Sequence, residues 1–235
     1  MNKILQGAER GLAGLRRYTA SPVLEKVLRR IAVRAPALAD DLERYLWQQG
    51  LTQKPFRLEG VIHAATALGR KVRFSLDTGP ARMVLPRNWK GKQIQTAILR
   101  TAGDSVRHWG VGRLDLVAEQ FRKELGSRLA DVLVASLVPQ LPGFAWLDQG
   151  EGWFWRRNQH NALLTQIRKT LVVTGPLPLR ELRRGLRRCR RLEGYVPPDD
   201  ILLELCRQAE GLEVRGTTII PQSIPDSVLS PNEQI

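Results

Sequence analysis

The sequence predicts a mostly α-helical fold with small β-hairpins, arranged as three similar units in tandem. Stretches in which apolar residues recur at helical spacing occur three at a time. Each group is followed by a short hairpin pattern with Gly, Pro or Asp at its turn, and the whole pattern recurs about every 65 residues. Three helices followed by a two-stranded hairpin is the order of a winged helix. We therefore expect an α+β fold of three tandem winged-helix units.

The first unit is expected at residues 22–86. Ser21-Pro22 is typical of a helix start, because proline is favoured at the first helical position. A hairpin is expected to turn at the Asp-Thr-Gly-Pro sequence of residues 77–80. The apolar stripes predict helices at 23–33, 36–49 and 57–68.

The second and third units are expected at residues 93–157 and 161–221. In the second unit, Gly103 and Gly110 predict breaks after the first helix. The hairpins are expected to turn at residues 148–152 and at residues 215–216. The predicted helices cover 93–102, 113–125 and 127–137 in the second unit, and a stretch beginning near 161, then 179–192 and 199–209 in the third.

The charge balance favours a polyanionic partner. The chain has 235 residues, a formal net charge of +14 and a pI near 10.8. It begins with a basic lead-in at 1–21 and ends with a polar, proline-containing tail at 222–235, which we expect to be disordered. No apolar run reaches membrane-spanning length, and no secretory signal is evident. The two cysteines suggest reduced thiols, so we expect a bacterial cytosolic, nucleoid-associated protein.

The strongest local signal is the arginine-rich segment at residues 180–192. It holds seven arginines, and its apolar residues recur every three or four positions, which predicts a helix with one core face. Like charges repel along a helix, and phosphates relieve this because guanidinium groups bind them bidentately. The alternatives are pairing with acids such as Asp199, Asp200 and Glu204, or plain solvation. The seven candidate nucleic-acid-binding residues are Arg180, Arg183, Arg184, Arg187, Arg188, Arg190 and Arg191.

Basic residues also gather around the hairpins and the first linker. The third helix of each unit is not basic, so we expect contact through the second helix, the hairpins or the linker rather than through base reading. Trp89 in the linker and the tryptophans of the second hairpin are expected to be packing residues. Arg82 lies in the first hairpin, where a basic strand serves either binding or solubility. The additional candidate binding residues are Arg70, Lys71, Arg73, Lys90, Lys92, Arg156 and Arg157.

Catalysis finds little support in the sequence. His63, His108 and His160 are scattered over three units, and Cys189 and Cys206 lack metal-ligand spacing. No P-loop, GxGxxG or GxSxG motif occurs. We expect no enzyme activity, no cofactor and no metal.

The segment 152–216 resembles the tandem winged-helix segments of bacterial sigma-factor-like helix-turn-helix proteins. In that family a GWFW-type strand precedes an N-x-L-L-x-x-I-R-K helix, a basic helix and a V-P-P-x-x-x-L-L-x-L-C helix. The resemblance implies a winged-helix fold and DNA binding. The matching residues are Gly152, Trp153, Phe154, Trp155, Asn161, Leu163, Leu164, Ile167, Arg168, Lys169, Val196, Pro197, Pro198, Leu202, Leu203, Leu205 and Cys206.

From these observations we expect a non-enzymatic protein that binds double-stranded DNA mainly through phosphates. It would act as a transcription regulator or as a DNA-binding subunit of a larger machine. The alternative is a winged-helix adaptor that binds a protein partner in a nucleic-acid-processing or defence complex. The apolar, non-basic third helices favour that alternative.

Overall fold

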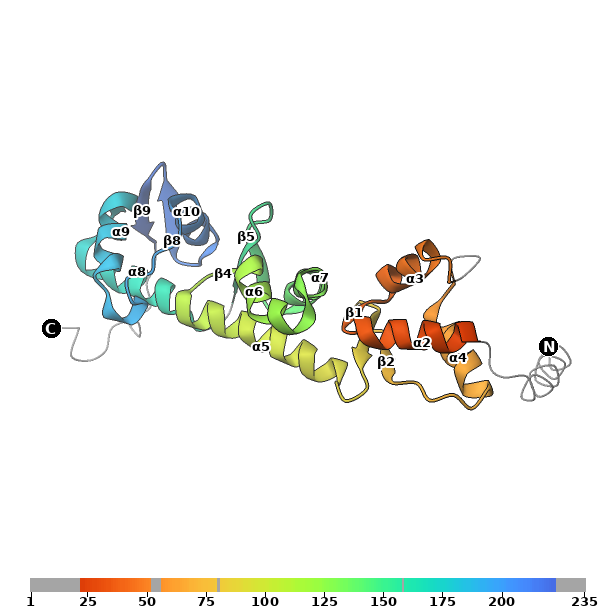
Figure 1. Cartoon of the computed structure of the whole chain (residues 1–235). Helices are drawn as coiled ribbons and strands as arrows, with labels where there is room; N and C mark the ends of the chain where they lie inside the picture. The colour runs from red at the N-terminus through yellow and green to blue at the C-terminus, as the bar shows by residue number, and fades with distance from the viewer. Residues whose placement is uncertain (1–21, 52–55, 80, 158, 223–235) are drawn as a thin grey trace, which may run out of the picture. The chain divides into compact units, whose positions relative to one another are not determined.

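The computed structural model describes residues 22–51, 56–79, 81–157 and 159–222 (Figure 1). The expected lead-in at 1–21, nearly all of the expected tail and the side chain of Arg191 lie outside this description. The described chain is mostly α-helical and carries small three-stranded antiparallel sheets, which confirms the α+β class.

One order of elements recurs three times along the described chain: helix, two-residue strand, helix, helix, strand, strand. We name these stretches the first, second and third repeats. The first comprises α2 (Pro22–Arg34), β1 (Ala37–Leu38), α3 (Ala39–Gln48), α4 (Leu58–Ala67), β2 (Phe74–Asp77) and β3 (Met83–Pro86).

The other two repeats follow the same order, with short 3-10 helices added. The second comprises α5 (Gly91–Trp109), β4 (Gly112–Arg113), α6 (Leu114–Leu125), α7 (Ser127–Leu137), η1 (Val138–Gln140), β5 (Phe144–Asp148) and β6 (Trp153–Arg156). The third comprises α8 (Ala162–Thr174), β7 (Leu177–Pro178), α9 (Leu179–Arg187), η2 (Arg190–Leu192), α10 (Asp199–Gln208), β8 (Leu212–Arg215) and β9 (Thr218–Pro221).

Each sheet places the last strand of the repeat between the other two. The prediction of two-stranded hairpins was wrong in this respect, because β1, β4 and β7 are too short to show an alternating pattern. One backbone hydrogen bond recurs beside each sheet, from the first N–H of the second helix to the carbonyl that precedes the last strand. The three bonds are Ala39 N to Arg82 O (2.9 Å), Leu114 N to Gly152 O (3.0 Å) and Leu179 N to Thr217 O (2.8 Å).

Several predicted boundaries need correction. The break expected at Gly103 is absent, because α5 continues through it to Trp109. The helix expected at 179–192 ends at Arg187, and the last turn lies at Gly216-Thr217 rather than at 215–216. By contrast, the helix predicted at residues 127–137 is confirmed at both ends.

Two compact units divide the described residues. One contains residues up to 95 together with 121–133, and the other contains 96–120 together with residues from 134 onward. In the first unit, buried side chains of α2, α3 and α4 meet at Ile31, Leu46 and Leu58. Burial of such side chains is the main source of stability for a helix of this length.

The second unit joins the hairpin of the second repeat to the third repeat. Trp155 lies in one core with the helices α8, α9 and α10, and its indole Nε1–H donates to Gln208 Oε1 at 2.8 Å. The Gln208 amide donates to the carbonyl of Trp146 at 2.8 Å. Asn161 caps α8 and donates its side-chain amide to the carbonyl of Gly110 at 2.6 Å. These bonds fasten α10 to the preceding hairpin and α8 to the end of α5.

Candidate nucleic-acid interface

The helix α9 has one apolar side and one cationic side. Leu179, Leu182 and Leu186 are buried in the core of the third repeat, with at most 5% of their surface exposed. A helix of 3.6 residues per turn places these three leucines on one face. Four of the six remaining positions are arginine and one is glutamate, so the side of α9 that faces away from the core carries net positive charge.

Three arginines of α9 and Arg188, the C-cap residue directly after it, form a stripe on that outer side, which we call the α9 stripe. Arg180, Arg184, Arg187 and Arg188 are exposed, and within the described part of the chain none forms an ion pair. Their spacing of four, three and one residues places them within about 100° of the helix circumference. Arg180 and Arg187 are separated by roughly 10 Å along the axis, which matches about three base-pair steps of one DNA strand.

Arg183 has a different environment from its neighbours. Its guanidinium forms an ion pair with Asp199 at the start of α10, and its Nε is buried without a partner in the described structure. Pairing with an acid, one of the alternatives considered from the sequence, is therefore realised at Arg183 and at no other arginine of the segment whose side chain the structure describes. Asp200 is exposed, and Glu204 bonds instead to Arg207 and Gln208. Arg183 consequently joins two helices, and the α9 stripe stays available.

The arginine segment does not continue as one helix. After Arg188 the chain leaves α9, and Arg190 lies in the short 3-10 helix η2. Glu193 follows with a positive φ of 49°, which ends η2 in the left-handed region. Arg190 is exposed but belongs to a different helical segment from the α9 stripe.

The other predicted residues are divided between the two units. Lys71, Arg73, Lys90 and Lys92 are exposed and belong to the first unit, while Arg157 is exposed in the second. Two candidates have internal contacts: Arg70 pairs with Glu25 at 2.9 Å, and Arg156 Nε donates to the carbonyl of Pro142 at 3.0 Å.

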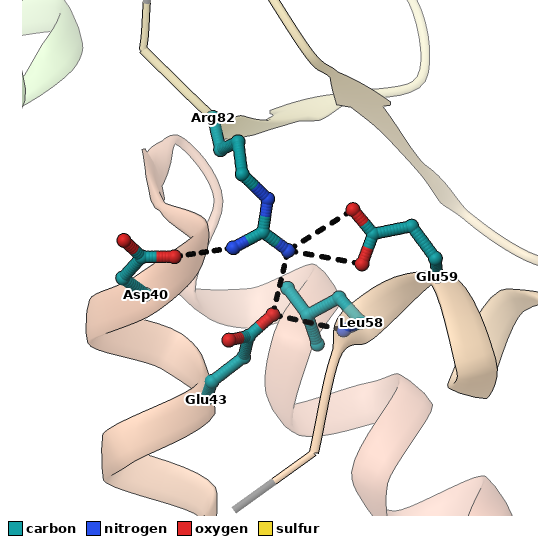
Figure 2. Close-up of polar contacts among 5 residues, drawn as sticks. All are labelled: Asp40, Glu43, Leu58, Glu59 and Arg82. Atoms are coloured by element: carbon teal, nitrogen blue, oxygen red, sulfur yellow. Dashed lines mark hydrogen bonds and ion pairs between the residues drawn. The ribbon is translucent and has the colours of Figure 1, made fainter.

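Arg82 is not a free basic residue of the first hairpin. Three carboxylates surround its guanidinium (Figure 2): Nη1 donates to Asp40, and Nη2 donates to Glu43 Oε1 at 2.8 Å and to Glu59 Oε2 at 2.9 Å. Glu43 Oε1 also accepts the backbone N–H of Leu58 at 2.9 Å, which satisfies one donor at the start of α4. This cluster ties α3, α4 and the start of β3 together, so the expectation of a basic surface was wrong at Arg82.

The electrostatics of the Arg82 cluster favour the charged forms. Hydrogen bonding to Glu43, and then to Glu59, raises the pKa of Arg82 above its ordinary value. A backbone hydrogen bond at Glu59 itself, followed by the bond from Arg82, lowers the pKa of the Glu59 carboxyl. No local pattern indicates this cluster, because its members lie 23 to 42 positions from Arg82 along the chain.

The third helix of the third repeat is less suited to contact nucleic acid than α9. Its first turn carries Asp199 and Asp200, whose charges favour a helix N-terminus but repel phosphates. Another part of its surface is covered by the preceding hairpin through Gln208. The cationic surface of the third repeat is therefore carried by α9.

The described histidines and cysteines do not gather into a metal site. Among the described residues, no three His, Cys, Asp or Glu side chains gather closely enough to hold a metal ion. His63, His108 and His160 are all exposed. Burial raises the pKa of the Cys206 thiol to about 12, which keeps it protonated and unreactive. No helix within the described ranges combines the length and apolar character that crossing a bilayer requires.

No protein-family model matches the chain, and no curated protein is significantly similar to it in sequence. We therefore base the functional argument on the arrangement of its own side chains.

Proposed function

We propose that this chain is a non-enzymatic nucleic-acid-binding protein made of three tandem winged helices, and that it binds double-stranded DNA mainly through phosphates. The α9 stripe is the observation on which this proposal depends. Four guanidinium groups share one exposed side of a short helix and its C-cap, without a carboxylate partner among the described residues. Phosphate oxygens suit such a row, because each guanidinium presents a planar fork of donors.

The recurring element order supports the winged-helix part of the proposal. Each repeat has the sequence helix, strand, helix, helix, strand, strand, with a sheet in which the last strand is central. Contact through second helices fixes position on the duplex but carries little sequence information. This mode of binding suits a DNA-binding subunit of a larger machine or a transcription regulator, as the sigma-factor-like resemblance also implies.

Charge reversal on the α9 stripe tests the proposal. We expect the triple variant Arg184→Glu, Arg187→Glu, Arg188→Glu to raise the Kd for a duplex DNA by about 100-fold or more near 0.1 M salt. The slope of log K against log salt should fall by about 3, because three phosphate contacts are lost. Fluorescence anisotropy over a salt series measures both quantities.

The matched control reverses the same amount of charge elsewhere. Arg100, Arg107 and Lys123 are exposed and lie on α5 and α6. Changing all three to Glu should alter the slope by less than about 1. Equal effects of the two triple variants would show that net charge alone governs binding and would remove the α9 stripe from the proposal.

A second candidate function is a protein-binding adaptor, favoured by apolar side chains exposed on α8. Val172 is 39% exposed and Val173 is 77% exposed, next to one another near the end of that helix. An adaptor would show no salt-sensitive affinity for duplex DNA in the titration above. Its partner binding would instead be weakened by Val172→Ser, Val173→Ser.

A further inference from the structure

A basic cleft lies in the first repeat, between α2 and the segment that connects α4 to β2. Its volume is about 510 Å³. Four cationic side chains line it, together with one acid. They are Arg29, Arg70, Lys71 and Arg73, with Glu25.

Most of this positive charge has no internal counterpart. Arg29, Lys71 and Arg73 are exposed and form no ion pair with any described carboxylate. Arg70 Nη1 lies 2.9 Å from Glu25 Oε1, but the Nε of Arg70 is buried and has no hydrogen-bond partner among the described residues. Because Arg29, Lys71 and Arg73 line the cleft without any carboxylate partner in the described chain, it is suited to an anion that brings several acceptor oxygens.

The third repeat has a cleft at the equivalent position, but different side chains line it. Buried Val27 and Ile31 of α2 match Ile167 and Leu171 of α8, since both helices have 13 residues and end at the same distance before the two-residue strand. A smaller cleft of about 300 Å³ lies between α8 and the segment that connects α10 to β8.

In that third-repeat cleft, Trp155 of the preceding hairpin forms part of the lining. Arg168 lies there as well, and its Nη2 donates to the backbone carbonyl of Glu210 at 2.9 Å. In the first repeat, Leu28 occupies the position of Arg168, and four cationic side chains line the cleft in place of the tryptophan. The third-repeat cleft is thus smaller and includes a tryptophan of the preceding hairpin, whereas the first-repeat cleft is larger and lined by four cations.

We propose that the cleft of the first repeat binds a phosphate group, and that Glu25 competes with this phosphate for Arg70. A phosphate offers acceptors to Arg70, Lys71 and Arg73 at once, while Glu25 satisfies only one side of Arg70. This inference deepens the proposed function and rests on it for the source of the phosphate, which is the DNA backbone. The charge of the cleft is an independent observation.

The first test removes the negative charge of Glu25, which competes with phosphate for Arg70. The variant Glu25→Gln should lower the Kd for duplex DNA about three- to tenfold near 0.1 M salt, because Arg70 is freed for phosphate. The control Glu124→Gln makes the same change in net charge at an exposed position of α6, and it should change the Kd by less than about twofold. Equal effects of the two variants would overturn the role of Glu25.

The second test removes the cations and separates the two sources of phosphate. Arg70→Gln, Arg73→Gln should weaken binding of duplex DNA about tenfold, and it should abolish binding of inorganic pyrophosphate measured by calorimetry. If the unaltered protein binds pyrophosphate but not DNA, and the double variant loses pyrophosphate, the cleft is a phosphate site and the proposed function fails. If the unaltered protein binds DNA strongly and the double variant binds DNA and pyrophosphate with unchanged affinity, the cleft proposal fails and the proposed function stands.

Discussion

The helices α3 and α9 occupy the same place in their repeats but carry opposite charge. Each begins directly after the short first strand, and its first N–H donates to the carbonyl that precedes the last strand. The α3 sequence holds three acids and one arginine, whereas α9 holds four arginines and one glutamate. In both helices the leucines face the core, so the fold constrains the buried face and leaves the sign of the outer face free.

The fifth residue of the two helices makes this difference concrete. It is Glu43 in α3 and Arg183 in α9, and each forms an ion pair that ties the second helix to another part of its own repeat. Glu43 meets Arg82, while Arg183 meets Asp199. An ion pair is kept at this position although its polarity is reversed. The comparison predicts that the fifth residue contributes to stability, whereas its outward-facing neighbours contribute to binding.

The largest effect on stability is expected for Arg82→Ala. Removing this guanidinium leaves Asp40, Glu43 and Glu59 facing one another without a counter-charge, which should cost about 2–4 kcal/mol. Hydrogen exchange of the α3 and α4 amides, followed in the full chain, measures this loss locally. The exposed Arg87, at the other end of β3, serves as the control, and Arg87→Ala should change exchange by less than about 0.5 kcal/mol. Similar exchange in both variants would show that the Arg82 cluster does not stabilise the first repeat.

A smaller effect is expected from two adjacent arginines with opposite roles. Arg183→Ala should destabilise the third repeat by about 1 kcal/mol, because Asp199 loses its partner at a partly exposed site. Arg184→Ala should leave stability within about 0.5 kcal/mol and should weaken DNA binding instead. Thermal unfolding and anisotropy, measured on both variants, give the two readouts. The distinction between the fifth residue and the α9 stripe fails if both variants show the same pattern.

The smallest effect concerns pH. The pKa of Glu59 is lowered in the folded chain, so its contribution to stability is present above its ordinary pKa of 4.5 and is lost as the pH falls through the folded value. Because Glu59 is 42% exposed, solvent screening keeps this contribution below about 1 kcal/mol. Exchange at α4 measured at pH 6 and below pH 4 should reveal it in the unaltered chain, and Glu59→Gln should remove that part of the pH dependence. An unchanged pH dependence in Glu59→Gln would assign the effect to other carboxyls.

Local patterns were sufficient to predict most helices but not the contacts between them. The stripe of leucines in α9 predicted its buried face, and Ser127 with the apolar residues after it predicted α7. The helix break predicted at Gly103 was wrong. One glycine in a helix lowers its stability by only about 1 kcal/mol, and burial of Ala102 and Val106 offsets that loss.

The candidate binding surface was predictable only in part for the same reason. Amphipathic spacing placed the arginines of 180–188 on the outer side of a helix, and the exposed α9 stripe agrees with that expectation. The spacing could not show which arginine turns toward Asp199, since that depends on how α10 packs. Likewise, the cluster around Arg82 arises from three separate elements, and no sequence window contains it.

The amide of Asn161 has a consequence for how the second and third repeats are spaced. It is 4% exposed, and it uses its oxygen at the start of α8 and its nitrogen at the Gly110 carbonyl. Aspartate has no N–H to offer that carbonyl, so even a near-isosteric replacement would set two acceptors against each other. Asn161 therefore acts together with Trp155 and Gln208 to set the direction in which α8 leaves the end of α5, and Asn161→Asp is expected to loosen the third repeat from the end of α5.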